Sequence, residues 1–294
     1  MKLVSFETEG EWHIGAVVDD GDHLVDLTAA GVAADMTVLI GAGRDGLAAA
    51  RAAVAKSSRR MPLRGLRIGA PIPHPRRNIF CVGKNYVAHA TEFARSGFDH
   101  SSQAEELPEC PIIFTKATTS VIGPGEPIPG RSDQTNSVDY EGELAVIIGA
   151  AGRNIAARDA LAHVFGYTIV NDVTARTVQQ RHKQWFLGKS FDGFCPMGPC
   201  LLTADAFGAP ADTVLRTRVN GEERQRARIS ELIFDVATLI ETISFGTTLI
   251  PGDIIATGTP AGVGIGFKPP RYLRAGDVVS VEIDGIGILE NPVI

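Results

Sequence analysis

Two glutamates, Glu141 and Glu143, stand two positions apart in the segment DYEGELAVII. On a β-strand, side chains two residues apart point to the same face, so these two carboxylates would project together. Leu144, Val146 and Ile148 would then line the opposite, apolar face. Because two like charges side by side repel, a divalent cation would stabilise the pair. The pattern therefore indicates either a metal site or an ordinary solvent-facing strand.

A third acid, Asp172, ends the strand-like segment FGYTIVND. The end of a strand would place this carboxylate at the rim of a sheet, where it can converge with Glu141 and Glu143. Carboxylate oxygens without Cys or His favour Mg²⁺, Mn²⁺ or Ca²⁺ over zinc. The three acids are thus the candidate ligands of one divalent ion.

A histidine and a glutamate are three residues apart, at His89 and Glu92 in NYVAHATEF. This spacing puts both side chains on one face of a helix, where the carboxylate can orient the imidazole and raise its basicity. The same spacing is also typical of a simple surface contact. The polar segment 95–111 that follows lacks periodicity, which indicates a loop or lid.

The elements that must position these residues are mostly short strands. Residues 3–27 have the pattern of an antiparallel meander, residues 44–57 that of an Ala-rich helix, and residues 62–75 form a Pro-rich connection. Many short strands without regular strand and helix alternation predict an α+β fold, mostly β. We expect a small β-rich N-terminal domain at 1–70 and a catalytic body at 71–294. Further helices are expected at about 85–95, 174–183 and 230–243.

The composition is that of a globular protein, with 294 residues, 44% hydrophobic and 21% charged. The net charge, 28 − 34 = −6, argues against a nucleic-acid partner. No apolar run approaches the ~18 residues of a membrane span, so a soluble, cytoplasmic protein is expected. The four scattered cysteines are expected to be buried thiols.

Two short motifs resemble nucleotide sites, but their context does not fit. GAGRDG at 41–46 has the spacing of a dinucleotide fingerprint, yet no acid lies near 20 residues further on, so we predict a turn between helices. Gly188, Lys189 and Ser190 resemble the end of a P-loop, but Lys183 occupies the position of its first glycine. No GxSxG nucleophile motif is present.

Seven segments, taken together and in order, resemble the fumarylacetoacetate hydrolase family from about Asn78 to Pro292. These segments are VGKNYVAHATEF, FTKATTSVIGPGEPI, DYEGELAVIIG, NDVTARTVQ, GKSFDGFCPMGP, IPGDIIATGTPAGVG and GDVVSVEIDGIGILENPV. The resemblance implies a mixed β-roll or sandwich body, one Mg²⁺ (or Mn²⁺ or Ca²⁺) per subunit, and a homodimer. It also implies that Glu141, Glu143 and Asp172 bind the metal.

The resemblance assigns further roles to single residues. His89 would deprotonate water, supported by Glu92, and Lys189 would hold a substrate carboxylate or enolate beside the metal. The remaining carried-over residues are substrate contacts, at Gln179, Thr259, Arg176 and Lys116. For the last two of these, packing or ion pairing is the favoured alternative.

The function implied is hydrolysis of a carbon–carbon bond in an acylpyruvate-type 1,3-diketo acid, for example fumarylpyruvate from aromatic catabolism, with release of pyruvate. Isomerisation of 2-hydroxyhepta-2,4-diene-1,7-dioate and decarboxylation of oxaloacetate are alternatives that use the same Mg²⁺ and enolate chemistry. A catalytically silent metal-binding or scaffold protein is disfavoured, because the acids, the base and the lysine are all retained. The expected partner is a small keto acid, without nucleic acid or membrane.

Overall fold

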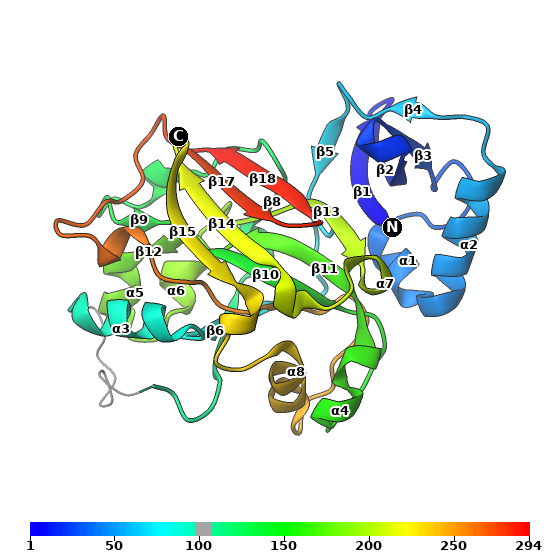
Figure 1. Cartoon of the computed structure of the whole chain (residues 1–294). Coiled ribbons are helices and arrows are strands. Elements are labelled where there is room, and N and C mark those ends of the chain that lie inside the picture. Colours follow the sequence, from blue (N-terminus) through cyan, green and yellow to red (C-terminus); the bar gives the residue numbers. More distant parts are fainter. Residues whose placement is uncertain (98–106) are drawn as a thin grey trace.

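A large mixed sheet runs through the whole computed structural model, which describes residues 1–97 and 107–294 (Figure 1). Its strands follow the order β4-β3-β2-β1-β13-β11-β10-β16-β6-β7, with β5 paired to β1 and β8 paired to β13. In chain order they are β1 (Lys2–Thr8), β2 (Glu11–Val18), β3 (His23–Asp26), β4 (Met61–Pro62), β5 (Arg67–Gly69), β6 (Ile79–Gly83), β7 (Ile112–Lys116), β8 (Val121–Ile122), β10 (Gly142–Ile148), β11 (Val164–Asn171), β13 (Cys195–Thr203) and β16 (Ile254–Ala256).

A second sheet packs against the first. Its four strands follow the order β15-β14-β17-β18, and β9 pairs separately with β12. The bounds are β14 (Val214–Val219), β15 (Glu222–Arg228), β17 (Val278–Ile283), β18 (Gly287–Pro292), β9 (Val138–Asp139) and β12 (Thr174–Ala175). The α-helices are α1 (Met36–Gly41), α2 (Gly43–Lys56), α3 (Val87–Arg95), α4 (Ala157–Ala160), α5 (Arg176–His182), α6 (Phe186–Lys189), α7 (Ala204–Phe207) and α8 (Val236–Ser244). This mostly β arrangement confirms the expected fold class.

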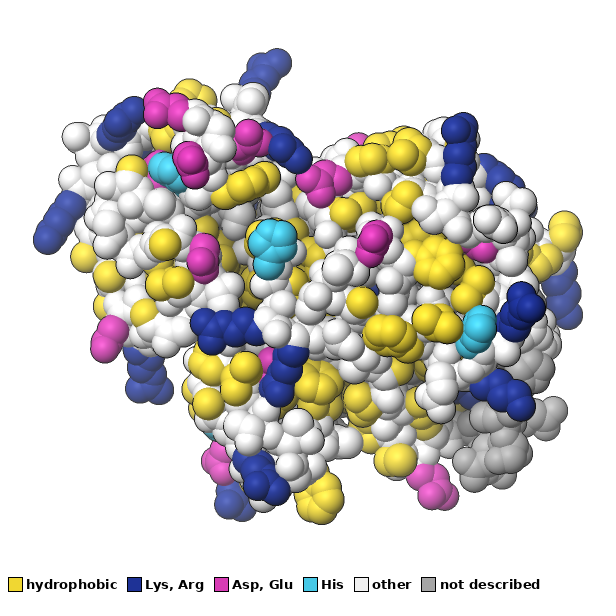
Figure 2. All heavy atoms as spheres, turned by 180° about the vertical axis from the view of Figure 1, so that it is seen from behind, with side chains coloured by type: hydrophobic (Ala, Val, Ile, Leu, Met, Phe, Trp, Pro, Cys, Tyr) yellow, Lys and Arg dark blue, Asp and Glu magenta, His cyan; other side chains and the backbone are white. Residues whose placement is uncertain are grey.

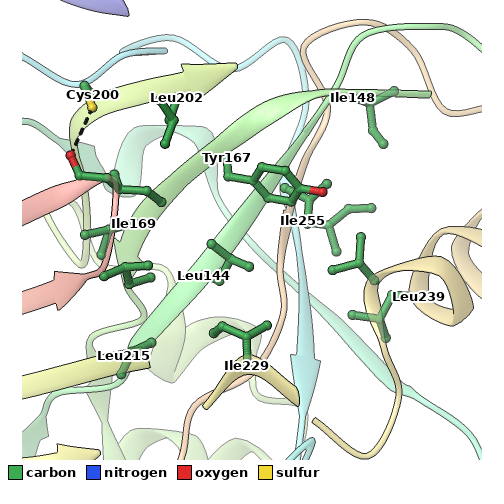
Figure 3. Close-up of a cluster of buried hydrophobic side chains, with 14 of the residues drawn as sticks. Leu144, Ile148, Tyr167, Ile169, Cys200, Leu202, Leu215, Ile229, Leu239 and Ile255 are labelled. Atoms are coloured by element: carbon green, nitrogen blue, oxygen red, sulfur yellow. Dashed lines mark hydrogen bonds between the residues drawn. The ribbon is translucent and has the colours of Figure 1, made fainter. Parts of the chain in front are cut away.

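Hydrophobic cores lie on both faces of the large sheet. Leu144 and Ile148 of β10 pack in one core with Leu215 of the second sheet and Leu239 of α8 (Figure 3). Ala145, also on β10, points the other way, into a core that includes residues of α1 and α2. Because both faces are covered, β10 is buried along its length. The site at its end therefore stands on a rigid base.

The N-terminal meander continues the large sheet. Strand β1 pairs with β13 through Lys2 opposite Leu202 and Leu3 opposite Leu201. In Figure 1 the first residues, with α1 and α2, form one end of the molecule. The division at residues 1–70 and 71–294 stays a prediction.

Three details refine the sequence expectations. GAGRDG lies where α1 ends and α2 begins, which confirms the predicted turn, and Gly43 adopts φ +56° there. The helix expected at 230–243 begins only at Val236, because Asp235 caps it by accepting a hydrogen bond from the Thr238 N–H at 2.8 Å. Cys81, Cys195 and Cys200 are buried, but Cys110 is exposed, so the expectation of four buried thiols was wrong at that position.

The surface seen from behind shows hydrophobic side chains spread over the face, with charged side chains between them and along the edge (Figure 2). In the part of the chain that the structure describes, no helix is long and apolar enough to cross a membrane. The expected lid at 95–111 falls largely on residues 98–106, which lie outside the described residues.

Candidate active site

The three predicted metal ligands converge at one rim of the large sheet. Glu141, Glu143 and Asp172 bring carboxylate oxygens within 4.8 Å of one another, and all three are buried. The antiparallel pairing of β10 with β11 sets this arrangement, because the Asp172 N–H donates to the Glu141 carbonyl at 2.8 Å. The carboxylates thus come from the start of one strand and the end of its neighbour.

A glycine between the two glutamates is required by close packing. A Cβ at Gly142 would lie 2.3 Å from Thr217 Oγ1 and 2.8 Å from Val281 Cγ1, both on the second sheet. No larger residue fits between the two sheets without moving them. The EGE sequence therefore combines two ligands on one face with close sheet packing on the other.

Three buried cations accompany the acids. Lys189 Nζ lies 2.7 Å from Glu141 Oε2 and 2.6 Å from Asp172 Oδ2. Arg176 bridges Glu141 and Asp139, at 2.7 Å and 2.9 Å. The third cation is Lys116, whose Nζ lies 2.7 Å from Asp172 Oδ1. All but one of the buried carboxylates at the site therefore have a cationic partner.

The exception is Glu143. Its side chain is 1% exposed, it accepts a hydrogen bond from the Gly258 N–H at 2.8 Å, and no cation among the described residues pairs with it. Asp139, Glu141 and Asp172 thus share three buried cationic partners (Lys116, Arg176 and Lys189), and Glu143 is the buried carboxylate of the group without an ion pair among the described residues. Three convergent carboxylates, one of them without an ion pair, fit a divalent ion such as Mg²⁺ or Mn²⁺.

The two glutamates titrate very differently. Burial, and then the charges of Asp172 and Glu141, raise the pKa of Glu143 well above its usual range. Burial also acts to raise the pKa of Glu141, but the charges of Lys189 and Arg176 outweigh it and lower that pKa to about 2. Glu141 is therefore ionised at neutral pH, whereas Glu143 favours a neutral form until a cation compensates its charge.

His89 faces the same pocket from helix α3 and is 5% exposed. Its Nδ1 lies 3.4 Å from Glu92 Oε2, a long contact that leaves Nε2 for a ligand. Glu92 in turn accepts from the Gly262 N–H at 3.0 and 3.1 Å. Gly262 adopts φ +103°, and a Cβ there would lie 1.8 Å from the Arg224 carbonyl oxygen. The glycine turn thus fixes the carboxylate that orients the histidine.

A pocket joins these groups. Residues of α3, α5 and α6 line part of it, and these helices lie near one another at one end of the body (Figure 1). Its lining residues are Val82, Gly83, Lys84, His89, Phe93, Phe114, Glu141, Glu143, Arg176, Gln179, Trp185, Lys189 and Thr259.

Three of the four expected substrate contacts line the pocket, and one does not. Gln179 and Thr259 line the pocket, and Thr259 Oγ1 also donates to the Gly142 carbonyl at 3.0 Å. Arg176 lines it as well, although its guanidinium is held by acids. Lys116 is not among the described residues that line the pocket, and its ammonium donates to the Val173 and Lys189 carbonyls besides pairing with Asp172. These contacts give Lys116 the supporting, ion-pairing role.

Sequence reasoning missed an aromatic side of the pocket. Phe93, Phe114 and Trp185 come from distant parts of the chain, and the Trp185 ring lies edge-on to both phenylalanines. Lys84 also lines the pocket, and no motif indicates a role for it. An aromatic residue without a motif around it gives no sequence signal of a binding site.

The family profile "Fumarylacetoacetate (FAA) hydrolase C-terminal" matches residues 78–294. The chain belongs to the fumarylacetoacetate hydrolase family. Among relatives in this family is the oxaloacetate tautomerase YisK of Bacillus subtilis (strain 168), 51% identical over 228 residues, which are 78% of this chain and 73% of YisK.

Solved structures of the fumarylacetoacetate hydrolase family match over the whole chain. A fumarylacetoacetate hydrolase from Exiguobacterium antarcticum is 44% identical with a TM-score of 0.84, covering 100% of this chain and 99% of that one. A maleylpyruvate hydrolase from Sphingobium sp. SYK-6, in complex with manganese(II) and pyruvate, is 32% identical with a TM-score of 0.79 and the same coverage. The chain is therefore similar to family enzymes that act on keto acids by more than one reaction.

Proposed function

We propose that this chain is a metal-dependent enzyme that interconverts the enol and keto forms of a small 2-oxo acid, with oxaloacetate as substrate. The observation that supports this most directly is that Lys189 and His89 face one pocket together with the acids Glu141 and Glu143. The similarity to an oxaloacetate tautomerase favours this reaction over hydrolysis.

The reaction moves one proton and needs no redox partner. In the enol, the oxygen on C2 loses its proton, the C2=C3 double bond becomes C2=O, and C3 gains a proton. A divalent ion held by the three acids would supply charge that favours a negatively charged oxygen on C2.

The residues of the chain have separate tasks in this scheme. Lys189, fixed by Glu141 and Asp172, stabilises negative charge that develops on the C2 oxygen. His89 transfers the proton at C3 through Nε2, because its Nδ1 is next to Glu92. The aromatic residues exclude water from the reacting carbon.

The test is the decay of the ultraviolet absorbance of enol oxaloacetate with Mg²⁺ or Mn²⁺. The wild type should accelerate it, chelator should abolish the effect, and His89→Gln should lose roughly 10²- to 10⁴-fold in rate while still binding metal. His182→Gln, at an exposed histidine, is the control and should behave as the wild type. A wild type no faster than buffer with metal would refute the tautomerase proposal.

Hydrolysis of an acylpyruvate, with release of pyruvate, is the second candidate. It is favoured by the histidine and carboxylate pair, because attack by water requires an oriented general base. Pyruvate release from acylpyruvates and fumarylpyruvate, measured beside the tautomerase assay, distinguishes the two reactions. Efficient cleavage with no effect on enol oxaloacetate would favour the hydrolase.

We also propose a cytoplasmic homodimer with one metal ion per subunit, on the basis of the family resemblance. Light scattering of the purified chain and metal analysis after dialysis test the dimer and the stoichiometry. A monomeric mass at micromolar concentration would contradict the proposed homodimer.

A further inference from the structure

The glycine turn, residues 262–266, encloses the carboxylate that contacts the histidine. The Gly262 N–H donates to both Glu92 oxygens, and a Cβ at Gly266 would lie 2.0 Å from Glu92 Oε1. The contact of Glu92 with His89 Nδ1, at 3.4 Å, is close to the limit of a hydrogen bond. A small displacement of the glycine turn would therefore break it.

A second buried acid, Asp139, binds the same turn. Its Oδ1 accepts from the Gly264 N–H at 2.7 Å, and its Oδ2 accepts from the Ile265 N–H at 3.0 Å. A Cβ at Gly264 would lie 2.6 Å from Asp139 Oδ1, so the close approach requires glycine. Asp139 is 0% exposed, which commits its carboxylate to these partners.

The Asp139 carboxylate also reaches the metal side of the site. Arg176 Nε donates to Asp139 Oδ2 at 2.9 Å, and Arg176 Nη2 lies 2.7 Å from Glu141 Oε1. Asp139 itself is not among the three described acids whose oxygens converge. It therefore links a candidate metal ligand to the glycine turn without being a ligand.

The next residue, Tyr140, contacts the turn at a different point. Its hydroxyl donates to the Gly262 carbonyl at 2.8 Å, while the N–H of the same glycine donates to Glu92. Burial, and then the charge of Asp139, raise the pKa of Tyr140, so the hydroxyl keeps the proton that it donates. Both peptide groups next to the Gly262 Cα are thus fixed by side chains.

We propose that Asp139 and Tyr140 are positioning residues that hold the glycine turn against Glu92. Glu92 then keeps the proton of the neutral His89 ring on Nδ1 and leaves Nε2 as the acceptor. Through its arginine partner, Asp139 holds the metal ligands and the base in one relative position. This inference rests on the proposed function in that His89 is the residue that moves the substrate proton.

The tautomer of His89 tests this without turnover. Nitrogen NMR of histidine-labelled, Mg²⁺-loaded protein, at a pH where the ring is neutral, should place the proton on Nδ1, with His89→Gln identifying the signal. In Asp139→Asn an amide N–H replaces an acceptor oxygen, so the turn should loosen and the signal should shift toward a mixture of tautomers. Tyr140→Phe should shift it in the same direction.

Asp253→Asn is the matched control. Asp253 is also buried, at 4% exposure, and accepts from an arginine, Arg77, and from the Ile250 N–H at 2.8 Å. It is not among the described residues that line the pocket. Asp253→Asn should lower Tm, as Asp139→Asn does, and leave the His89 tautomer unchanged.

Enol oxaloacetate kinetics at saturating Mg²⁺ give a second readout. Tyr140→Phe keeps every charge, and it should lower kcat roughly 10- to 100-fold with KM little changed, the range typical of residues that support a catalytic group. In a His89→Gln background the same substitution should have little further effect, because it acts through His89.

Tyr140→Phe decides the question where Asp139→Asn does not fold. A wild-type proton on Nε2, a His89 signal that the folded variants leave unchanged, or additive losses in the double variant would overturn the proposal. A wild type that lacks tautomerase activity but shows the expected shifts would contradict the proposed function alone.

Discussion

Each carboxylate at the site has its own electrostatic surroundings. Lys189 and Arg176 compensate Glu141, whereas Glu143 is buried at 1% exposure beside two other acids. A buried charge without a partner destabilises the fold, and a carboxyl group reduces that cost by taking up a proton. The same feature that weakens the metal-free protein therefore makes the site ready for a cation.

The raised pKa of Glu143 makes the stability of the metal-free protein depend on pH in a known direction. Because the folded pKa of Glu143 is raised, the folded state binds a proton that the unfolded chain releases above its ordinary pKa. The stability of the metal-free protein should therefore rise as pH falls from 8 toward 5. Glu143→Gln removes this contribution, so its stability advantage over the metal-free wild type should be largest at pH 8 and shrink at lower pH.

Chemical denaturation of both proteins at several pH values measures the difference between their free energies of unfolding. This difference should amount to about 1.4 kcal/mol for each unit by which folding raises the pKa of Glu143. Saturating Mn²⁺ should reverse the order, because only the wild type retains all three ligands. A constant difference between pH 8 and pH 5 would show that Glu143 is ionised throughout.

At the scale of single residues, the sequence predicted the positions that strand periodicity determines. Glu141 and Glu143 follow from strand alternation, and Asp172 follows from its place after an apolar run. The direction of the Lys116 side chain could not be predicted, because it depends on a contact with Asp172, 56 positions away along the chain. The roles of single residues stay predictions until variants are measured.

Short connections between elements shape the pocket. Gly83, the last residue of β6, packs directly against the indole of Trp185, and a Cβ there would lie 2.3 Å from a ring carbon of that side chain. The indole can move only by disturbing Phe93 and Phe114, which contact it on either side. The width of the pocket thus depends on one glycine.

Gly83→Ala should displace Trp185 and narrow the pocket. We expect KM for the substrate to rise at least ~10-fold, with a Tm loss corresponding to about 1–3 kcal/mol from overpacking. Trp185 fluorescence, recorded in a Trp12→Phe background, should shift as well. An unchanged emission spectrum together with an unchanged KM would show that Trp185 and its neighbours adjust to the added methyl group without changing the pocket.

Among the elements, α3 and α5 were expected close to their observed bounds, because their residues have helical spacing. The aromatic side of the pocket could not be predicted, since Phe93, Phe114 and Trp185 are brought together only by the tertiary fold. The start of α8 was placed too early, because Ile229–Glu231 forms a separate short turn before the cap at Asp235.

The N-terminal strands share the large sheet, and one of its hydrophobic cores, with the rest of the molecule. Leu3 and Ile14 of the first strands pack in the same core as Met197 and Leu201 of β13. The pairing of β1 with β13 joins residues nearly 200 positions apart, which no local pattern could reveal. The two expected domains should therefore unfold together.

Deletion of residues 1–70 tests this cooperativity. The remaining 71–294 would expose the edge of β13 and the apolar residues that β1 covers, so we expect aggregation or loss of a sharp thermal transition. Calorimetry of the intact chain should show a single transition. Two separated transitions, or a soluble and folded 71–294 fragment, would show that the domains are independent.

The two sides of the pocket also differ in how freely they can change over evolution. Glu143 and Asp172 lie at the ends of strands buried between two cores, where a substitution disturbs the fold itself. Lys84 and Trp185 lie on connections after β6 and before α6, outside the hydrogen-bonded ladder. Substitutions in these two connections can therefore reshape the aromatic side of the pocket while the strands that carry the three acids stay in place.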